Sequence, residues 1–425
     1  MKRASLRDIL VINTYWVGLS FMWSSLHVII LPAVLLHLVP ATQKNTYLGL
    51  LTFVGLVIAM IVQPISGSIS DGWVSSWGRR RPLITLGTAF DFLFLAFLGW
   101  AGGLGWIALG YIGLQLSSNI AHGPLQGLLP DRVPAEQLGR ASGFKNLMDM
   151  IGLVAASLIM GQMVSPDVRQ PVGPVGLVAV VLAAAAAVTL LGAHEEPALE
   201  RTSDRGGWFD AFRVDLRVHS GYAWLIGSRL LFLSGIYGIQ TFAQYYVRDV
   251  LAVPNPIALT GNLLATITLA LMVFAVGGGW LGDRFGHKAM SLVASLIGAL
   301  GCVLLLWART PETLLIFGSV VGMGIGLFLT ANWALCNQLA PADQAGKFLG
   351  LTNLATAGAG AIGRLEGPLI DLGNNANPGV WWGYSGLFIA GAVCILFSAV
   401  LLVKVPGRRM DNLNGSSESV DNTIL

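Results

Sequence analysis

The feature that most constrains this chain is a succession of long apolar runs. A helix needs about 20 mostly apolar residues to cross the hydrocarbon of a bilayer, because lipid offers no partner for backbone N–H and C=O groups. Hydrophobic residues make up 54% of the 425-residue sequence and charged residues only 11%. Twelve runs are long enough: 9–38, 47–70, 82–101, 104–129, 141–164, 172–193, 221–247, 257–282, 289–308, 312–338, 346–371 and 379–403.

The runs predict an all-α integral membrane protein with twelve transmembrane helices. They lack the alternation of a membrane barrel, and the 53 glycines favour closely packed helices. The first run is about twice as long as the core of a secretory signal, so we expect a retained helix. The cysteines lie in three different runs without metal-ligand spacing, which predicts no metal and no cofactor.

Basic residues are unevenly divided between the connecting segments. If the N-terminus lies inside the cell, the inner segments hold 19 of the 25 Lys and Arg residues, whereas Lys44, Arg169, Arg248 and Arg309 lie outside. Inner loops of membrane proteins are enriched in such residues, so both termini are expected in the cytoplasm, with the chain in the plasma or inner membrane. The formal net charge of +3 then reflects topology and predicts no nucleic-acid partner.

Two sequence segments recur in the second half of the chain. "GSISDGWVSSWGRRRP" (67–82) returns in shortened form as "GWLGDRFGHK" (279–288), and "PAEQLGRASGFKNL" (134–147) returns as "PADQAGKFLGLTNL" (341–354). The second pair is displaced by 207 residues, from Pro134 to Pro341. The repeats predict two pseudo-symmetric six-helix halves at 1–193 and 221–404, a polar cytoplasmic linker at 194–220 and a cytoplasmic tail at 405–425.

These loops resemble those of the major facilitator superfamily, and the longer first loop with "HGPLQGLLPD" (122–131) resembles its glycoside-cation symporters and sucrose transporters. The resemblance implies transport by alternating access, with loop charges that join the halves when the transporter faces outward. It assigns gate roles to Asp71 with Arg79 and Arg80, and to Asp283 with Arg284. Gly72 stands where the family usually has arginine. The alternative is that the loop arginines only fix orientation.

Polar and aromatic side chains form stripes on three of the predicted helices. Amides form paired hydrogen bonds with sugar hydroxyls and aromatic rings stack on C–H faces, so the stripes favour a sugar site between the halves. The alternative is that the amides join helices and the tryptophans mark the membrane interface. The candidate residues, with three more in the tenth and eleventh runs, are Asn13, Trp16, Ser20, Trp23, His27, Gln115, Asn119, His122, Gln126, Tyr237, Gln240, Gln244, Asn332, Trp333 and Asn353.

Charged residues inside the runs are candidates for proton coupling. Asp149 and Glu366 are the preferred acids and Asp91 a third, with Arg229 and Arg364 as counter-charges. The alternative for Asp149 is a structural ion pair with Lys145, four residues away on the same helix. Arg364 and Glu366 are two residues apart and cannot face each other.

The sequence departs from plant sucrose transporters in the fourth run. Gln115 and Gln126 stand where those proteins carry an aspartate and an arginine, so proton coupling must use another acid or is absent. We therefore predict a monomeric secondary transporter for a sugar or similar polyhydroxylated solute. Uncoupled facilitation, lipid or amphiphile transport and a non-transporting scaffold stay open. No nucleophile, base or metal set points to an enzyme.

Overall fold

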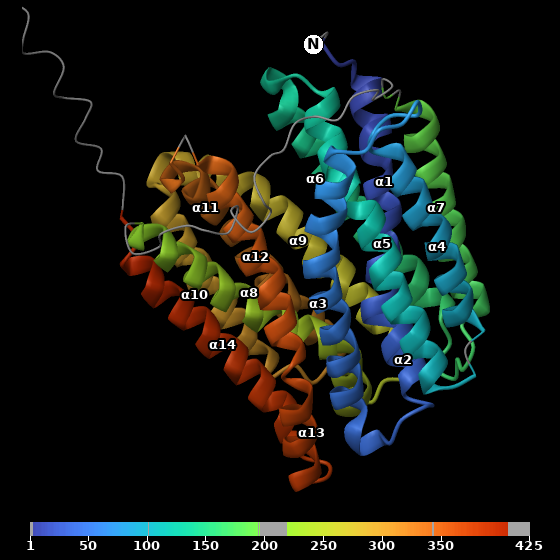
Figure 1. Ribbon diagram of the computed structural model, residues 1–425. Helices are drawn as coiled ribbons and strands as arrows, with labels where there is room; N and C mark the ends of the chain where they lie inside the picture. Colours follow the sequence, from blue (N-terminus) through green and yellow to red (C-terminus); the bar gives the residue numbers. More distant parts are fainter. Residues whose placement is uncertain (1–2, 101, 194, 196–218, 342–343, 407–425) are drawn as a thin grey trace, which may run out of the picture.

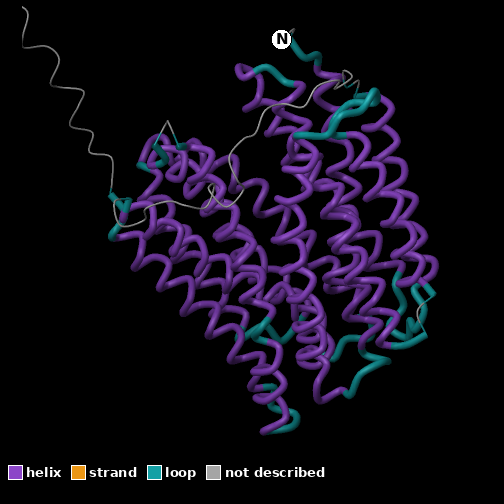
Figure 2. Tube along the Cα trace, viewed as in Figure 1, coloured by secondary structure: helices purple, strands orange, loops and turns teal. Residues whose placement is uncertain are grey.

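The computed structural model describes residues 3–100, 102–193, 195, 219–341 and 344–406, which form helices and connecting loops without a strand (Figure 2). The first half contains α1 (Leu6–Ser24), the π-helix η1 (Ser25–Ile30), α2 (Leu31–Leu35), η2 (Ala41–Gln43), α3 (Lys44–Asp71), α4 (Arg81–Gly99), α5 (Leu104–Arg132), η3 (Ala135–Gln137), α6 (Leu138–Met163) and α7 (Val172–Gly192). The second contains α8 (Ser220–Tyr246), the π-helix η5 (Val247–Leu251), α9 (Pro256–Phe285), α10 (His287–Leu305), α11 (Pro311–Leu339), α12 (Ala345–Arg364), α13 (Gly367–Ala376) and α14 (Trp382–Val403).

One pattern of helix packing occurs twice (Figure 1). In the first half α1 packs on α6 and α7, as α8 packs on α12 and α14 in the second. Helix α5 packs on α3 and α4, as α11 packs on α9 and α10, and the α4–α7 pair corresponds to α10–α14. The prediction of an all-α protein with two pseudo-symmetric halves is confirmed.

Ten helical segments of the described chain are long and apolar enough to cross a membrane, and one of them, Leu6–Leu35, joins α1, η1 and α2. Helices α5 and α12 do not reach that apolarity, but they pack like their counterparts. The predicted continuous run 346–371 was wrong. Helix α12 ends at Arg364 and α13 begins at Gly367, because Pro368 has no N–H to continue the ladder of α12.

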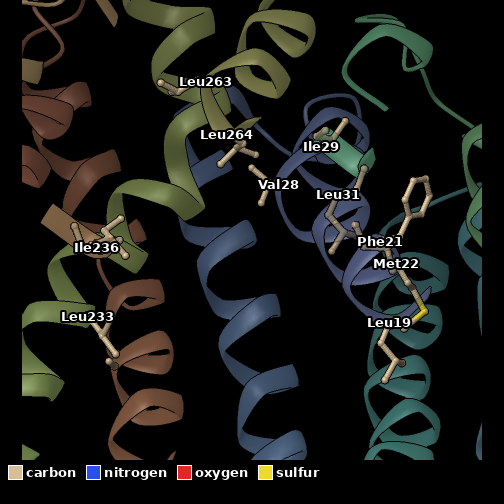
Figure 3. Close-up of a cluster of buried hydrophobic side chains, with 14 of the residues drawn as sticks. Leu19, Phe21, Met22, Val28, Ile29, Leu31, Leu233, Ile236, Leu263 and Leu264 are labelled. Atoms are coloured by element: carbon tan, nitrogen blue, oxygen red, sulfur yellow. The ribbon is translucent and has the colours of Figure 1, made fainter. Parts of the chain in front are cut away.

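The halves meet along α6 and α9 and along α3 and the α12–α13 pair. Glycines permit both approaches. Gly161 and Gly261 face each other closely. A methyl group added at Gly161 would lie 3.2 Å from the Gly261 Cα atom, and one added at Gly261 would lie 3.0 Å from the Gly161 Cα atom. Gly49 lies directly against the carbonyl oxygen of Arg364. Apolar side chains complete the interface, and Figure 3 shows Val28 of η1 pointing toward Leu264 of α9.

The two ends of the bundle differ. We call the end with the N-terminus and the α3–α4 loop the terminal face, and the end with α2 and α13 the closed face (Figure 1). Among the described residues, the hydrogen bonds and ion pairs between the halves lie at the closed face, as between Lys44 and Asp249 or Asn45 and Asp371. Figure 1 shows α3 and α12 separating toward the terminal face.

The repeated loops contain glycines in matching conformations. Gly78 before α4 has φ 95° and Gly286 before α10 has φ 91°, values that side chains with a Cβ atom disfavour. Both glycines directly precede the basic cluster of their repeat. Most of the predicted linker 194–220 and of the predicted tail 405–425 lies outside the described residues, so the predicted boundaries of these segments stay predictions.

Candidate solute site between the halves

A hydrogen-bonded cluster from α5 and η1 lies near the centre of the first half. The Tyr111 hydroxyl lies 2.8 Å from Nε2 of His27 and accepts a hydrogen bond of 2.7 Å from the Gln115 amide. Asn119 donates to the Gln115 backbone carbonyl at 2.7 Å. Trp23 stacks on His27 with ring centroids 5.0 Å apart. The cluster joins four predicted site residues to Tyr111, which the sequence analysis missed.

Arg364 and Tyr237 face this cluster from the second half. Both lie over Gly360, where an added methyl group would be 3.4 Å from the guanidinium and 3.7 Å from the tyrosine ring. Helix α3 connects the two groups, because Gly55 lies directly against Tyr111 and Gln115, and Leu56 lies against Gly360. The two halves therefore contribute to one polar region at the crossing of α3 and α12.

A cavity of about 260 Å³ adjoins this region. Tyr237 and Gln240 are among the few polar side chains that line it, and most of its wall consists of apolar residues from α8, α9 and α11. Leu153 of α6 closes it from the first half. The cavity can accept a C–H surface or an apolar group beside the polar cluster.

A second cluster of the first half lies about three helical turns closer to the terminal face, counted along α1. Trp16 and His122 meet edge to face with centroids 5.0 Å apart, and the Lys145 ammonium lies 4.1 Å from the Trp16 ring. Lys145 pairs with Asp149 at 2.6 Å, the structural pair that the sequence left as an alternative. Gln126 is exposed beside His122.

Arg229 occupies a corresponding level in the second half. It donates to Thr356 at 2.9 Å and to Asn332 at 2.9 Å, and its guanidinium lies 5.7 Å from the Trp333 ring. Trp333 is 39% exposed, so one side of this group is accessible. Asn353 of α12 is exposed, with no side-chain contact recorded among the described residues.

Three predicted site residues join helices. Asn13 donates to the Ala141 carbonyl of α6 at 3.1 Å, and Ser20 lies against Gly152 of the same helix. Gln244, with its amide nitrogen turned toward η1, donates to the Val28 carbonyl at 2.7 Å. These contacts match the alternative reading of the amides.

The predicted counter-charges do not meet the predicted acids. Among the described residues, neither Arg229 nor Arg364 lies within ion-pair distance of a carboxylate. Asp91 is fully buried within the first half, where its carboxylate accepts a hydrogen bond of 2.5 Å from the Ser117 hydroxyl. Glu366 lies outside a helix, in the break between α12 and α13, and its carboxylate packs directly against Gly238. The interruption between α12 and α13 turns the Glu366 side chain away from Arg364.

The predicted gate residues at the α3–α4 loop form a network within one half. Arg80 pairs with Asp71 at 2.5 Å and with Asp131 at 2.8 Å, and Arg79 pairs with Asp131 at 2.6 Å. Burial opposes the charge of Arg80, but the hydrogen bond and charge of Asp131, with those of Asp71, outweigh it and raise the pKa of this guanidinium. The Glu195 carboxylate accepts hydrogen bonds from the backbone N–H groups of Arg80 and Arg81 at the start of α4.

Among the described residues, Asp283 and Arg284 form no ion pair with each other, and their gate role stays a prediction. Asp283 is 79% exposed and lies 3.4 Å from His287, whereas the Arg284 guanidinium lies over the Trp280 and Phe285 rings. Neighbours in one helix project in different directions, so adjacent charges cannot pair.

The closed face has a set of contacts between the halves that the sequence did not reveal. The Lys44 ammonium forms an ion pair with Asp249. The Asp249 carboxylate also accepts a hydrogen bond of 2.7 Å from the Tyr384 hydroxyl. The Asp371 carboxylate of α13 accepts a hydrogen bond of 2.8 Å from the Asn45 side chain and one of 2.7 Å from the Thr46 N–H. These bonds connect the start of α3 to η5, α13 and α14, and so hold the halves together.

Comparisons with known proteins agree with this architecture. The chain is 22% identical over 382 residues to the multi-drug resistance efflux pump PmrA of Streptococcus pneumoniae, covering 85% of this chain and 86% of the relative. It is 25% identical over 148 residues to inositol transporter 4 of Arabidopsis thaliana, covering 35% of this chain and 24% of the relative. The alignments thus cover less than a third of the length of the Arabidopsis inositol transporters.

Among solved structures, the nucleoside transporter NupG superposes with a TM-score of 0.73 at 12% identity, covering 94% of this chain and 99% of that chain. The family model of the Major Facilitator Superfamily matches residues 10–364. The match spans both repeats, and the chain belongs to the Major Facilitator Superfamily.

Proposed function

We propose that this chain carries a sugar or similar polyhydroxylated solute across a cell membrane by alternating access. The observation that carries the proposal is the cluster of His27, Tyr111 and Gln115, which faces Tyr237 across the crossing of the two halves. Such side chains offer amide, hydroxyl and ring contacts to a polyol. The similarity to inositol transporters supports this solute class.

We infer that this conformation is closed to the outside. The excess of basic residues assigns the terminal face to the cytoplasm, and the closed face then lies outside. In this state the described ion pairs of Arg80 lie within one half, and the Lys44 and Asp371 contacts seal the other end. In the opposite state, the closed-face contacts open and the terminal-face loops approach.

Counterflow of radiolabelled sucrose, maltose and myo-inositol into proteoliposomes tests the proposal. We expect exchange above the level of protein-free vesicles, and a loss of about tenfold or more for Gln115→Ala, because the site loses a bidentate amide. Gln338→Ala, an exposed glutamine of α11, is the matched control and should exchange normally. Failure of all three solutes to exchange would reject the polyol assignment.

Amphiphile export is the second candidate, and the largely apolar cavity beside Gln240 favours it. The alignment with a multi-drug efflux pump over 85% of the chain agrees with this candidate. Uptake of ethidium into inside-out vesicles distinguishes the two, because export from the cytoplasm is directed into such vesicles. Ethidium transport without polyol exchange would favour export.

A further inference from the structure

Two arginines at membrane depth have no carboxylate partner in the described chain. Arg229 is 6% exposed and uses Nε and one terminal nitrogen on neutral oxygens. Arg364 donates to the Gly360 carbonyl at 2.8 Å, and its Nε is buried without a partner. Each guanidinium keeps N–H donors that the structure leaves unused.

An uncompensated charge at this depth is costly. A buried guanidinium loses its hydration, and neutral hydrogen bonds return only part of that free energy. Intramembrane charges without partners are therefore retained where they act on a transported species. A neutral polyol would leave the positive charges of both arginines unbalanced.

Among the described residues, no carboxylate lies within ion-pair distance of either arginine. Asp149 already pairs with Lys145 at 2.6 Å in the first half. The Glu366 carboxylate packs against Gly238 of α8, and Asp91 lies within the first half beside Ser117. The positive charges of the two guanidiniums thus remain, and the described residues offer no group that neutralises them.

Tyr237 lies beside Arg364. Its ring and the Arg364 guanidinium lie 3.7 and 3.4 Å from the position of a methyl group added at Gly360. Arg229 precedes Tyr237 on α8 by about two helical turns. Across the interface, Leu56 of α3 lies against Gly360, and its neighbour Gly55 lies directly against Tyr111 and Gln115. A solute between the polar cluster and Tyr237 would meet the Arg364 donors directly.

We infer that the solute carries a carboxylate or phosphate group, which Arg364 binds by charge-assisted hydrogen bonds while Arg229 adds a second positive charge. This inference rests on the proposed function and narrows its solute class to acid-bearing polyols. Planar guanidinium donors match the paired oxygens of carboxylate and phosphate. The hydroxyl groups of the same solute contact Gln115 and Tyr111.

Binding to the purified full chain tests the inference, with the fluorescence of Trp23 and the other tryptophans as readout. The probes are glucose, glucuronate, glucose 6-phosphate and lactate. We expect glucuronate or glucose 6-phosphate to bind about tenfold more tightly than glucose, because one charged hydrogen bond contributes about that much. The stronger of the two identifies the acidic group.

Variants separate a binding role from a structural one. Arg364→Gln should reduce the affinity for the acid much more than the affinity for glucose. Arg364→Lys should keep most of the preference, and Arg309→Gln, an exposed control in the second half, should keep all of it. Melting temperature and gel filtration confirm that each variant is folded.

Three results would overturn the inference. They are equal affinities for glucose and both acids, equal loss of glucose and acid binding in Arg364→Gln, and no binding of any probe. Exchange of neutral polyols without acid preference would overturn the charge assignment and leave the proposed function intact. If lactate binds as tightly as glucuronate while neutral polyols do not exchange, the acid site stands and the polyol assignment fails.

Discussion

The ammonium of Lys44, at the start of α3, forms a buried ion pair with the carboxylate of Asp249 in η5, across the boundary between the two halves. The two side chains are only 6% and 7% exposed. The Lys44 ammonium also lies 5.5 Å from the Tyr245 ring. A buried pair is costly to break, because each charge then lies unpaired. This contact therefore biases the protein toward the conformation closed at this face.

Asp249→Asn should shift the population toward the alternate conformation, in which the end of the bundle with α2 and α13 is open. Removal of one partner from a buried pair costs about 3 to 5 kcal/mol, enough to move a two-state equilibrium by more than a hundredfold. Distances between spin labels at Gln43 and Pro254, exposed residues on opposite halves, report the shift. The double variant Lys44→Asp with Asp249→Lys should restore the short distance. An unchanged distance in Asp249→Asn would show that the pair does not hold the face.

Gly261→Ala should weaken the α6–α9 crossing. Its added methyl group would overlap the Ser157 carbonyl oxygen, whereas a methyl group at Gly277 of the same helix meets no atom within 4 Å. Both substitutions gain the same helix propensity, about 1 kcal/mol, so their difference isolates the contact. We expect the label distance to increase only in Gly261→Ala. Equal behaviour of the two variants would mean that this crossing tolerates displacement.

Asp131→Asn should destabilise the first half by about 2 to 3 kcal/mol, because it leaves the buried Arg80 guanidinium with a weaker partner. Thermal unfolding of the purified protein measures the effect. Asp283→Asn is the matched control, since Asp283 is 79% exposed and should change stability by less than about 0.5 kcal/mol. If both variants melt like the parent, the loop network contributes orientation alone.

Glu366→Gln should abolish accumulation driven by a pH gradient while counterflow continues, if Glu366 carries the coupled proton. Its carboxylate is partly buried and Oε2 lacks a hydrogen-bond partner among the described residues, so a protonated form meets little opposition there. Asp149→Asn removes the other candidate, which Lys145 already neutralises. Accumulation that persists in both variants excludes the two acids. No accumulation in the parent indicates facilitated diffusion.

The sequence predicts the fold because apolar length and internal repeats are local signals. The loops at Gly78 and Gly286 recur in sequence and also in backbone conformation. Tyr111 was within reach of the same reasoning, since it lies four residues before Gln115 on the predicted stripe. The apolar run 104–129 alone does not single it out, because a tyrosine ring packs as readily as it binds.

Other features depend on distant contacts that periodicity does not encode. Spacings of three and four define a broad helical face. Along Leu6–Leu35 that face meets α6 at Asn13, and it meets Tyr111 of α5 at His27. Lys44 and Asp249 are 205 residues apart. The direction of Glu366 follows from the helix break before Pro368, which a continuous run concealed.

A reversible bridge across the closed face tests alternating access most directly. Lys44→Cys and Asp249→Cys, in a chain whose native Cys302, Cys336 and Cys394 are replaced by serine, can be joined by a short thiol cross-linker. The account predicts that counterflow of the transported solute stops when the bridge forms and returns on reduction, because the solute must leave through this face. Counterflow that continues through the bridged protein would contradict it.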